Sequence, residues 1–209
     1  MIVQVAKPAY SPNEYLEMET QASFRSEYRD GGIVPMAGGT TNHNEIVTNL
    51  CVALKPLLRT KGDRLFTENV RVWIERYQVF TYPDVMVIFR EPIYYGKGTS
   101  TVTNPCLIVE VASKSTKNYD QGDKFDYYRS LPSFQEYLLV EQYRLRVLQH
   151  VRQESGQWLL SDYEAEEDMV TLASLDLLLR LGDIYAGVDF SLPEDETNTM
   201  PEEKPSQSL

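Results

Sequence analysis

The 209-residue sequence is poor in cysteine and histidine, which excludes several kinds of metal site and cross-link. The two cysteines, Cys51 and Cys106, lie in apolar segments without CxxC spacing, so we expect two small buried side chains instead of a zinc site or disulfide framework. The two histidines, His43 and His150, are too few for a histidine cage. A metal site in this chain would need carboxylate ligands.

Long apolar runs are also absent. No segment approaches the ~18 apolar residues that span a bilayer, and the first residues lack the charged start and apolar stretch of a secretion signal. These absences predict a cytoplasmic protein with no membrane partner.

Positive charge is scarce, with 20 Lys and Arg against 31 Asp and Glu, for a net charge of −11. This balance disfavours nonspecific nucleic-acid binding, which depends on neutralising phosphates, but it leaves room for a local basic surface. Residues 191–209 combine acidic residues and prolines with almost nothing apolar. We therefore expect one domain over 11–190 and a disordered acidic tail over 191–209.

The remaining composition, 42% hydrophobic and 24% charged, is typical of a folded domain. Ser11-Pro12-Asn13-Glu14 has the pattern of a capping box and predicts a helix through about Met18. Asp30-Gly31-Gly32 between two short apolar segments predicts a hairpin that places Glu27 on a strand.

Apolar periodicity predicts the other elements. Helices are expected from residue 42 to about 61, with a kink near Pro56, and over 120–130. Strands are expected at 65–74, 82–89, 106–112, 137–140, 144–151, 158–163 and 175–181, followed by a helical turn at 182–187. This order predicts an α/β (α+β) fold with a mixed central β-sheet flanked by helices, an N-terminal hairpin and a C-terminal β extension.

Two carboxylates occupy strand positions whose neighbours predict burial. Asp84 follows Pro83 at the start of one expected strand, and Glu110 lies late in the next. If those strands are neighbours, both side chains converge at one end of the sheet. A buried ionised carboxylate needs a partner, and converging carboxylates suit a hard cation such as Mg²⁺. Each carboxylate alone is as easily explained by a salt bridge or a solvated strand end.

The ordered motifs resemble a known family. Tyr82-Pro83-Asp84 followed by Leu107-Ile108-Val109-Glu110-Val111 is similar to the paired motif of the PD-(D/E)xK restriction-endonuclease-like superfamily. Adding Glu27-x-x-Asp30-Gly31, His43, Ser113-x-Ser115-Thr116, Asp120 and Lys124 resembles, more narrowly, a bacterial putative restriction-endonuclease family formerly classed as a domain of unknown function. The resemblance covers about residues 11–187.

This resemblance implies a restriction-endonuclease-like core and a metal-dependent endonuclease that hydrolyses phosphodiester bonds in DNA with Mg²⁺ or Mn²⁺. Asp84 and Glu110 would be metal ligands, Glu27 a further acidic site residue, and His43 a pocket residue. A homodimer would suit cleavage of both DNA strands.

The sequence departs from the superfamily pattern at the lysine, because Ala112 occupies its expected position. Lys124 matches the lysine of the narrower family and is the first candidate for its replacement. Lys114 is the alternative, at a position where that family usually has proline.

Two other interpretations stay open. The missing lysine and the net charge of −11 favour a catalytically weak or inactive module that binds nucleic acid or a protein partner. A third interpretation is a structural α/β protein whose carboxylates are solvated strand ends.

Overall fold

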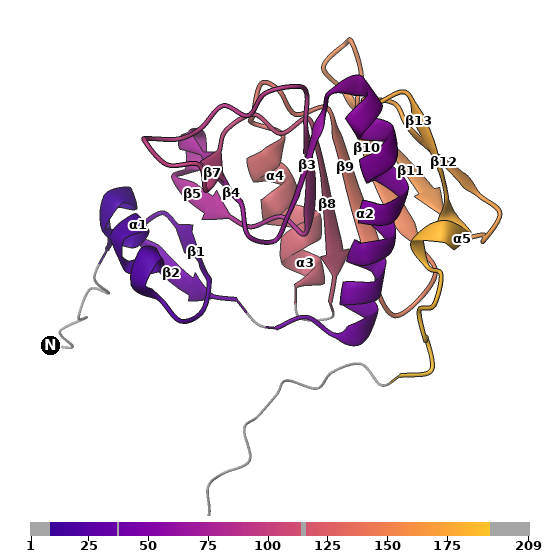
Figure 1. The fold of residues 1–209 in the computed structure, drawn as a ribbon, viewed down its shortest axis with the longest axis horizontal. Coiled ribbons are helices and arrows are strands. Elements are labelled where there is room, and N and C mark those ends of the chain that lie inside the picture. Colours follow the sequence, from indigo (N-terminus) through magenta and orange to yellow (C-terminus); the bar gives the residue numbers. More distant parts are fainter. Residues whose placement is uncertain (1–8, 37, 114–115, 193–209) are drawn as a thin grey trace, which may run out of the picture.

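The computed structural model describes residues 9–36, 38–113 and 116–192. Strands of these residues form a six-stranded sheet, a five-stranded sheet and a two-stranded hairpin (Figure 1). The six-stranded sheet lies at the centre, with the long helix α2 (Thr41–Lys61) on one side and shorter elements on the other.

The central sheet has the strand order β11-β10-β9-β8-β6-β3. Its strands are β3 (Arg64–Thr67), β6 (Val85–Ile88), β8 (Leu107–Ala112), β9 (Glu136–Glu141), β10 (Val147–Arg152) and β11 (Trp158–Tyr163). Strands β8 and β9 are parallel, and the other neighbours are antiparallel. Every residue of β8 is buried, as its unbroken apolar run predicts. The predicted α/β (α+β) fold with a mixed central β-sheet is confirmed.

One face of this sheet is covered by α2 together with the hairpin of β12 (Met169–Leu172) and β13 (Leu177–Arg180) and the short helix α5 (Leu181–Ile184). The apolar stripe of α2 and the odd-numbered residues of β6 and β8 face each other across this layer. The shared core includes Ile46, Leu50, Leu54, Leu58, Val85, Val87, Val109, Val111, Val170 and Leu181.

The opposite face is covered by helix α4 (Phe125–Tyr128) and by part of the second sheet. That sheet has the order β2-β1-β5-β4-β7. Its strands are β1 (Ser26–Arg29), β2 (Gly32–Pro35), β4 (Arg71–Ile74), β5 (Val79–Thr81) and β7 (Thr101–Val102), with the 3₁₀ turn η1 (Glu75–Tyr77) between β4 and β5. Helix α1 (Pro12–Gln21) packs on the second sheet through an aromatic cluster of Tyr15, Tyr28, Trp73 and Phe80.

Local sequence explains the helix ends. The predicted capping box is present, since Ser11 accepts from the Glu14 backbone and Glu14 accepts from the Ser11 backbone. Helix α2 begins after its N-cap Thr40 and ends at Gly62, whose φ of 78° is left-handed. The helix passes through Pro56 and continues to Lys61.

Some predicted boundaries were wrong. The strand expected at 65–74 is two strands in different sheets, because the chain turns at Glu68, whose φ is 28°. The strand expected at 82–89 covers only β6, since the Pro83-Asp84 segment separates it from β5. The C-terminal extension is a hairpin, because the strand predicted at 175–181, observed as β13, pairs with β12, which was not predicted.

The helix expected at 120–130 is composite. It consists of α3 (Lys117–Tyr119), a π-helical turn η2 (Asp120–Lys124) and α4. Cys106 is buried as predicted, whereas Cys51 is only partly buried on α2. The tail from residue 193 and the alternative lysine, Lys114, lie outside the described residues.

Candidate active site

Four strands of the central sheet end or begin at the same edge. β3 leads into Glu68, and β6 begins just after Asp84. Thr67 pairs with Val85 and Val85 with Val109, so the antiparallel registers bring Glu68, Asp84 and the second half of β8 to one side. Asp84 connects β6 to β8 directly, because its Oδ2 accepts a 2.6 Å hydrogen bond from the Val111 backbone.

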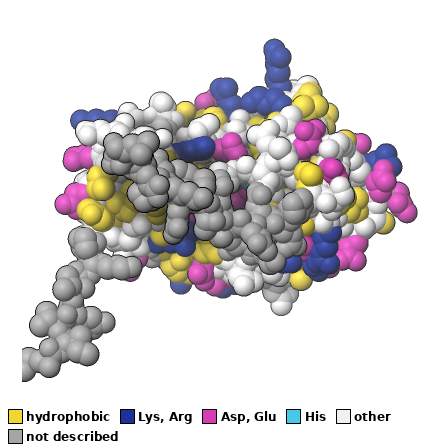
Figure 2. Space-filling model, turned by 90° about the horizontal axis from the view of Figure 1, so that it is seen from below, with side chains coloured by type: hydrophobic (Ala, Val, Ile, Leu, Met, Phe, Trp, Pro, Cys, Tyr) yellow, Lys and Arg dark blue, Asp and Glu magenta, His cyan; other side chains and the backbone are white. Residues whose placement is uncertain are grey.

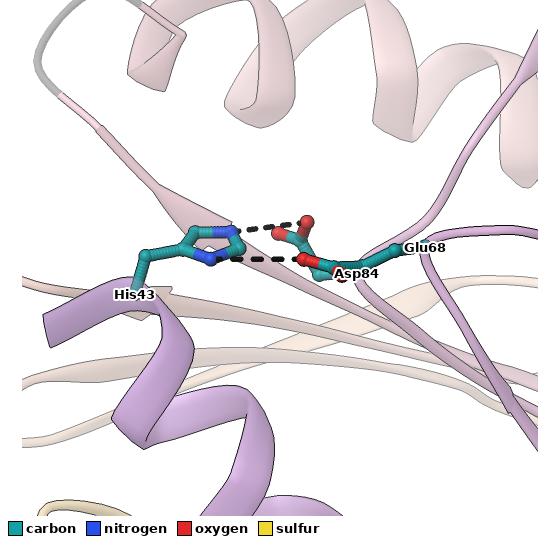
Figure 3. Close-up of side chains that lie close together, drawn as sticks. All are labelled: His43, Glu68 and Asp84. Carbon is teal, nitrogen blue, oxygen red and sulfur yellow. Dashed lines mark ion pairs between the residues drawn. The ribbon is translucent and has the colours of Figure 1, made fainter. Parts of the chain in front are cut away.

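His43 lies between two carboxylates at this edge (Figure 3). Its Nε2 is 3.1 Å from Asp84 Oδ1, and its Nδ1 is 3.9 Å from Glu68 Oε1. Burial alone would lower the pKa of His43, but the hydrogen bond and charge of Asp84, with Glu68, raise it above 6.5. The two acids therefore favour the protonated form of the imidazole.

The same three side chains fit one divalent cation. One ligand atom from each of His43, Glu68 and Asp84 lies within 4.8 Å of the others. Ligands at ~2.0–2.1 Å on opposite sides of a cation are about 4.2 Å apart, so only a small closure is required. Two carboxylates and one imidazole form a mixed O and N donor set that such a cation accepts.

The first turn of α2 positions His43. Thr40 Oγ1 accepts a 3.0 Å hydrogen bond from the His43 backbone. Thr40 also donates to Gln142, and Gln142 Nε2 donates to the Ala112 carbonyl at the end of β8. Gly39 lies directly against the ring, since a Cβ there would be 2.9 Å from His43 Nδ1. These contacts tie the start of α2 to the edge that carries Asp84.

Lys124 lies in a second, buried group beside the first. Its Nζ is 3.1 Å from Glu110 Oε2, 3.3 Å from Asp120 Oδ1 and 3.6 Å from Glu27 Oε1. The Lys124 side chain is only 9% exposed. Burial alone would lower its pKa, but the charges of Glu110, Glu27 and Asp120 raise that pKa well above its usual value. Lys124 is therefore a permanent cation in an acidic surrounding.

The three acids of this group have different surroundings. Glu110 accepts a 2.6 Å hydrogen bond from Tyr128. Burial raises the pKa of Glu110 well above 4.5, with Lys124 opposing it and Asp84 adding to it. Burial also raises the pKa of Asp120, and Asp120 Oδ1 has the Lys124 ion pair but no hydrogen bond.

Glu27 is the best-paired member of the group. Arg29 binds it at 2.6 Å, Tyr119 donates to it at 3.1 Å, and Thr81 also donates to it. Burial would raise the pKa of Glu27, but Lys124, Thr81 and Arg29 lower it below 4.5. The strand β1 of the second sheet thus supplies an ionised carboxylate that holds Lys124 in place.

The π-helical turn explains how Lys124 reaches the sheet. Asp120 and Lys124 are the first and last residues of η2, and both are buried. π-turns widen a helix locally and often occur at functional sites. Here the turn directs an acid and a cation from one helix toward Glu110 on β8.

The predicted site residues lie in two adjacent groups. Asp84 and His43 are in the first, and Glu27, Glu110 and Lys124 are in the second. Asp84 and Glu110 are on neighbouring strands, but their carboxylates have different partners here, and their joint binding of one cation stays a prediction. Lys124 is buried and paired with three acids.

The predicted roles omitted several residues of these groups. Glu68 lies in a turn that was predicted as the middle of a strand, so no signal marked it. Asp120 was noted as part of the family motif, and its i, i+4 spacing to Lys124 was the usable signal. Tyr128 and Tyr119 had no distinguishing signal among 14 tyrosines.

Comparison with known proteins identifies the family. Residues 12–181 match the model of the Uma2 family, described as putative restriction endonucleases. The chain is 38% identical over 166 residues to the uncharacterized protein sll1609 of Synechocystis sp. (strain ATCC 27184 / PCC 6803 / Kazusa), covering 79% of this chain and 94% of that protein. It is 36% identical over 183 residues to slr1290 of the same strain, covering 88% and 95%. The chain belongs to the Uma2 putative restriction-endonuclease family.

A solved structure shares the fold. The crystal structure of a putative nuclease belonging to DUF820 from Anabaena variabilis ATCC 29413 matches with a TM-score of 0.69 and 18% identity. The match covers 84% of this chain and 97% of that one. Within the described residues, we find no helix with the length and apolar character needed to cross a membrane.

Proposed function

We propose that this protein is a divalent-metal-dependent endonuclease that hydrolyses phosphodiester bonds in DNA. The observation that carries the proposal is the convergence at one sheet edge of His43, Glu68 and Asp84 with the Glu110–Lys124 ion pair. Membership of a putative restriction-endonuclease family supports it.

In this proposal Asp84 is the central metal ligand, Glu110 is its co-ligand as the sequence predicts, and His43 and Glu68 are further ligands of the same cation. The cation is Mg²⁺ or Mn²⁺, and the imidazole makes Mn²⁺ the better test ion because nitrogen is a softer ligand than oxygen. Such a cation supplies a polarised phosphoryl oxygen and a water of lowered pKa. His43 must lose its extra proton to become a ligand, so it couples metal binding to pH.

Lys124, paired with Glu110 at 3.1 Å, acts on the substrate in this proposal. Lys124 keeps its proton and can place an ammonium against the phosphoryl oxygens, where negative charge develops during hydrolysis. Glu27 and Asp120 are positioning residues, because each holds Lys124 through an ion pair, at 3.6 and 3.3 Å. Lys124 therefore replaces the superfamily lysine, whose position in this chain is occupied by Ala112.

Burial of this many charges argues against a purely structural role. Removing several ions from water is expensive, and buried ion pairs of this kind are seldom more stable than apolar packing. A chain that retains three acids and a lysine in its interior has a use for them other than stability.

A catalytically inactive binding module is the second candidate. Ala112 and the net charge of −11 favour it. The face in Figure 2 also intersperses basic with acidic side chains over its described part, unlike the continuous basic surface of a nonspecific DNA-binding protein.

Incubation with plasmid and with single-stranded DNA in Mg²⁺ or Mn²⁺ tests the proposal, with Glu110→Ala as the matched control. We expect cleavage by the wild type that requires metal and is lost in the variant. Equal cleavage by both proteins would indicate contamination. No cleavage of either substrate would favour the binding module.

A further inference from the structure

A cleft of about 340 Å³ opens where the parallel strands β8 and β9 end. Its lining includes Ala112, Ser113, Lys117, Asn118, Glu141 and Arg144. Ligands of α/β sheets commonly bind beyond the carboxyl ends of parallel strands, where the crossover leaves space. The proposed chemistry at Asp84 and Glu110 uses none of these lining residues.

The charged side chains of the lining carry more positive than negative charge. Glu141 is paired with Lys117 at 3.1 Å and with Arg144 at 2.8 Å. A third cation, Arg146, also contacts Glu141 but is held outside the cleft by Asp162 at 2.6 Å. Two cations of the cleft therefore face one carboxylate.

In this cleft the two cations are more exposed to solvent than the carboxylate. Arg144 is 51% exposed and Lys117 is 37% exposed, whereas Glu141 is 11% exposed. The hydrogen bonds from Arg144 and Lys117, which outweigh burial, lower the pKa of Glu141 to about 2, so it stays ionised behind them. The carboxylate thus acts as an anchor that fixes the two cations with their remaining donors toward solvent.

The cleft continues the row of site residues along the sheet edge. In the strand order β3, β6, β8, β9, this edge presents Glu68, Asp84, Glu110 and Glu141 in turn. Neighbouring strands are ~4.8 Å apart and the cleft lies two residues (~6.6 Å) further along β8 and β9, so it is on the order of 10 Å from Asp84. At ~3.4 Å of axial rise per nucleotide on one strand, this is a separation of about two or three nucleotides.

We propose that this cleft binds a backbone phosphate of the DNA strand that flanks the scissile phosphate. Lys117 and Arg144 provide the charge, and the Asn118 amide provides a neutral donor. Glu141 uses Nε and Nη2 of Arg144, so the remaining guanidinium donors and those of the Lys117 ammonium are left for phosphate oxygens. This inference rests on the proposed function, because it assumes that DNA lies along the edge containing Asp84.

The experiment measures the affinity of a labelled short DNA duplex in EDTA across a series of salt concentrations, for the full chain and four variants. Lys117→Gln and Arg144→Gln remove a cleft cation, and Lys97→Gln and Arg180→Gln remove an exposed cation elsewhere. Each phosphate contact contributes ~0.9 to the slope of log affinity against log salt. We expect the slope to fall by about 0.9 in each cleft variant and to stay unchanged in both controls.

For a fifth variant, Glu141→Gln, we expect the opposite change in duplex affinity from that of the two cleft-cation variants. Removing the anchoring charge leaves the cleft more positive, so we expect tighter duplex binding. Glutamine keeps a carbonyl oxygen that accepts hydrogen bonds from Arg144 and Lys117, so the cations stay in place, and weaker duplex binding by this variant would contradict the phosphate cleft. Unchanged melting temperatures in the cleft variants check that the fold is retained, and Glu141→Gln still decides the question if one of them fails to fold.

Two failures are distinguishable. A wild type that binds duplex with a slope unaffected by Lys117→Gln and Arg144→Gln overturns the phosphate cleft and leaves the proposed nuclease intact. A wild type that binds no duplex in EDTA and cleaves none in Mn²⁺ overturns both.

Discussion

Lys124 has three acidic neighbours in the interior, so its charge balances more than one carboxylate. Removing the lysine leaves Glu110, Glu27 and Asp120 close together, with Arg29 still paired to Glu27. Breaking a buried pair in this way typically costs about 3–5 kcal/mol, because an uncompensated charge stays buried. We expect Lys124→Met to lower the free energy of unfolding at neutral pH by about that amount, as measured by denaturant titration.

The double variant Lys124→Met/Glu110→Gln is the control for this explanation. If repulsion among the acids causes the loss, neutralising Glu110 should restore part of it, with a coupling of about 0.5–3 kcal/mol. Additive effects of the two substitutions would show that Lys124 stabilises the fold through packing of its aliphatic chain.

Glu141 predicts a pH dependence that is separate from the metal site. Hydrogen bonds from Arg144 and Lys117 outweigh burial and lower its pKa from 4.5 to about 2 in the folded protein. A lowered carboxyl pKa stabilises the fold above the unfolded value, and this stabilisation is lost as pH falls through 4.5 toward 2. The stability difference between wild type and Glu141→Gln should therefore shrink over that window in pH-dependent denaturant titrations. A stability difference between the two proteins that stays constant from about pH 6 to about pH 3 would contradict a lowered pKa of Glu141.

At the residue scale the sequence predicted more of the site than any single motif justified. Asp84 and Glu110 stood out because acids interrupt apolar strands, a pattern with a physical cost that needs an explanation. Glu68 could not be found in this way, because its position depends on a turn. Glu68 itself adopts the φ of 28° at this turn, and glutamate is not a residue type that marks turns in a sequence. The burial of Lys124 depends on β1, which is far from it in sequence.

The N-terminus of α2 is the element that positions His43, and Gly39 determines how closely the chain approaches its ring. A methyl group at Gly39 would lie 2.9 Å from Nδ1, whereas one at Gly38 would meet no atom within 4 Å. We expect Gly39→Ala to weaken Mn²⁺ binding at least several-fold by displacing the ring, and Gly38→Ala to bind as the wild type does. Calorimetric titration of both variants compares them directly.

Wild-type affinity in both glycine variants would remove His43 from the ligand set. Loss of binding in both would point to backbone stiffening of the 38–40 segment, since alanine restricts both positions alike.

Elements with a long apolar period were predictable, and short elements defined by tertiary contacts were not. The stripe on α2 and the apolar run of β8 appear directly in the sequence. β3 and β4 belong to different sheets, and a local sequence pattern does not indicate which sheet a strand joins. The π-turn at η2 has the same explanation, because a helical pattern does not distinguish α from π hydrogen bonding.

At the scale of the whole molecule, we propose a single domain over residues 11–190 with a dispensable acidic tail. Pro193, Pro201 and Pro205 lie in the tail with five acids and little to bury. Truncation after Ser191 should leave the melting temperature within about 1–2 °C of the full chain, since the removed sequence holds few apolar residues. A decrease of several degrees would show that the tail docks on the domain.

The net charge of −11 also acts at this scale. It opposes the approach of DNA over the whole surface, so association should depend on a few local cations such as those of the phosphate cleft. A homodimer, which we propose only as a route to cutting both strands, would double that negative charge and make these local contacts more important.

In the proposed site, the edge formed by β3, β6 and β8 holds one divalent cation through Asp84. Calorimetric titration of Mn²⁺ into wild type and Asp84→Asn tests it most directly. We predict one site in the wild type and at least ~10-fold weaker binding in the variant, because even the loss of an outer-shell partner typically costs ~10–100-fold. Metal should also raise the melting temperature of the wild type alone. Equal affinity in the two proteins would contradict the account.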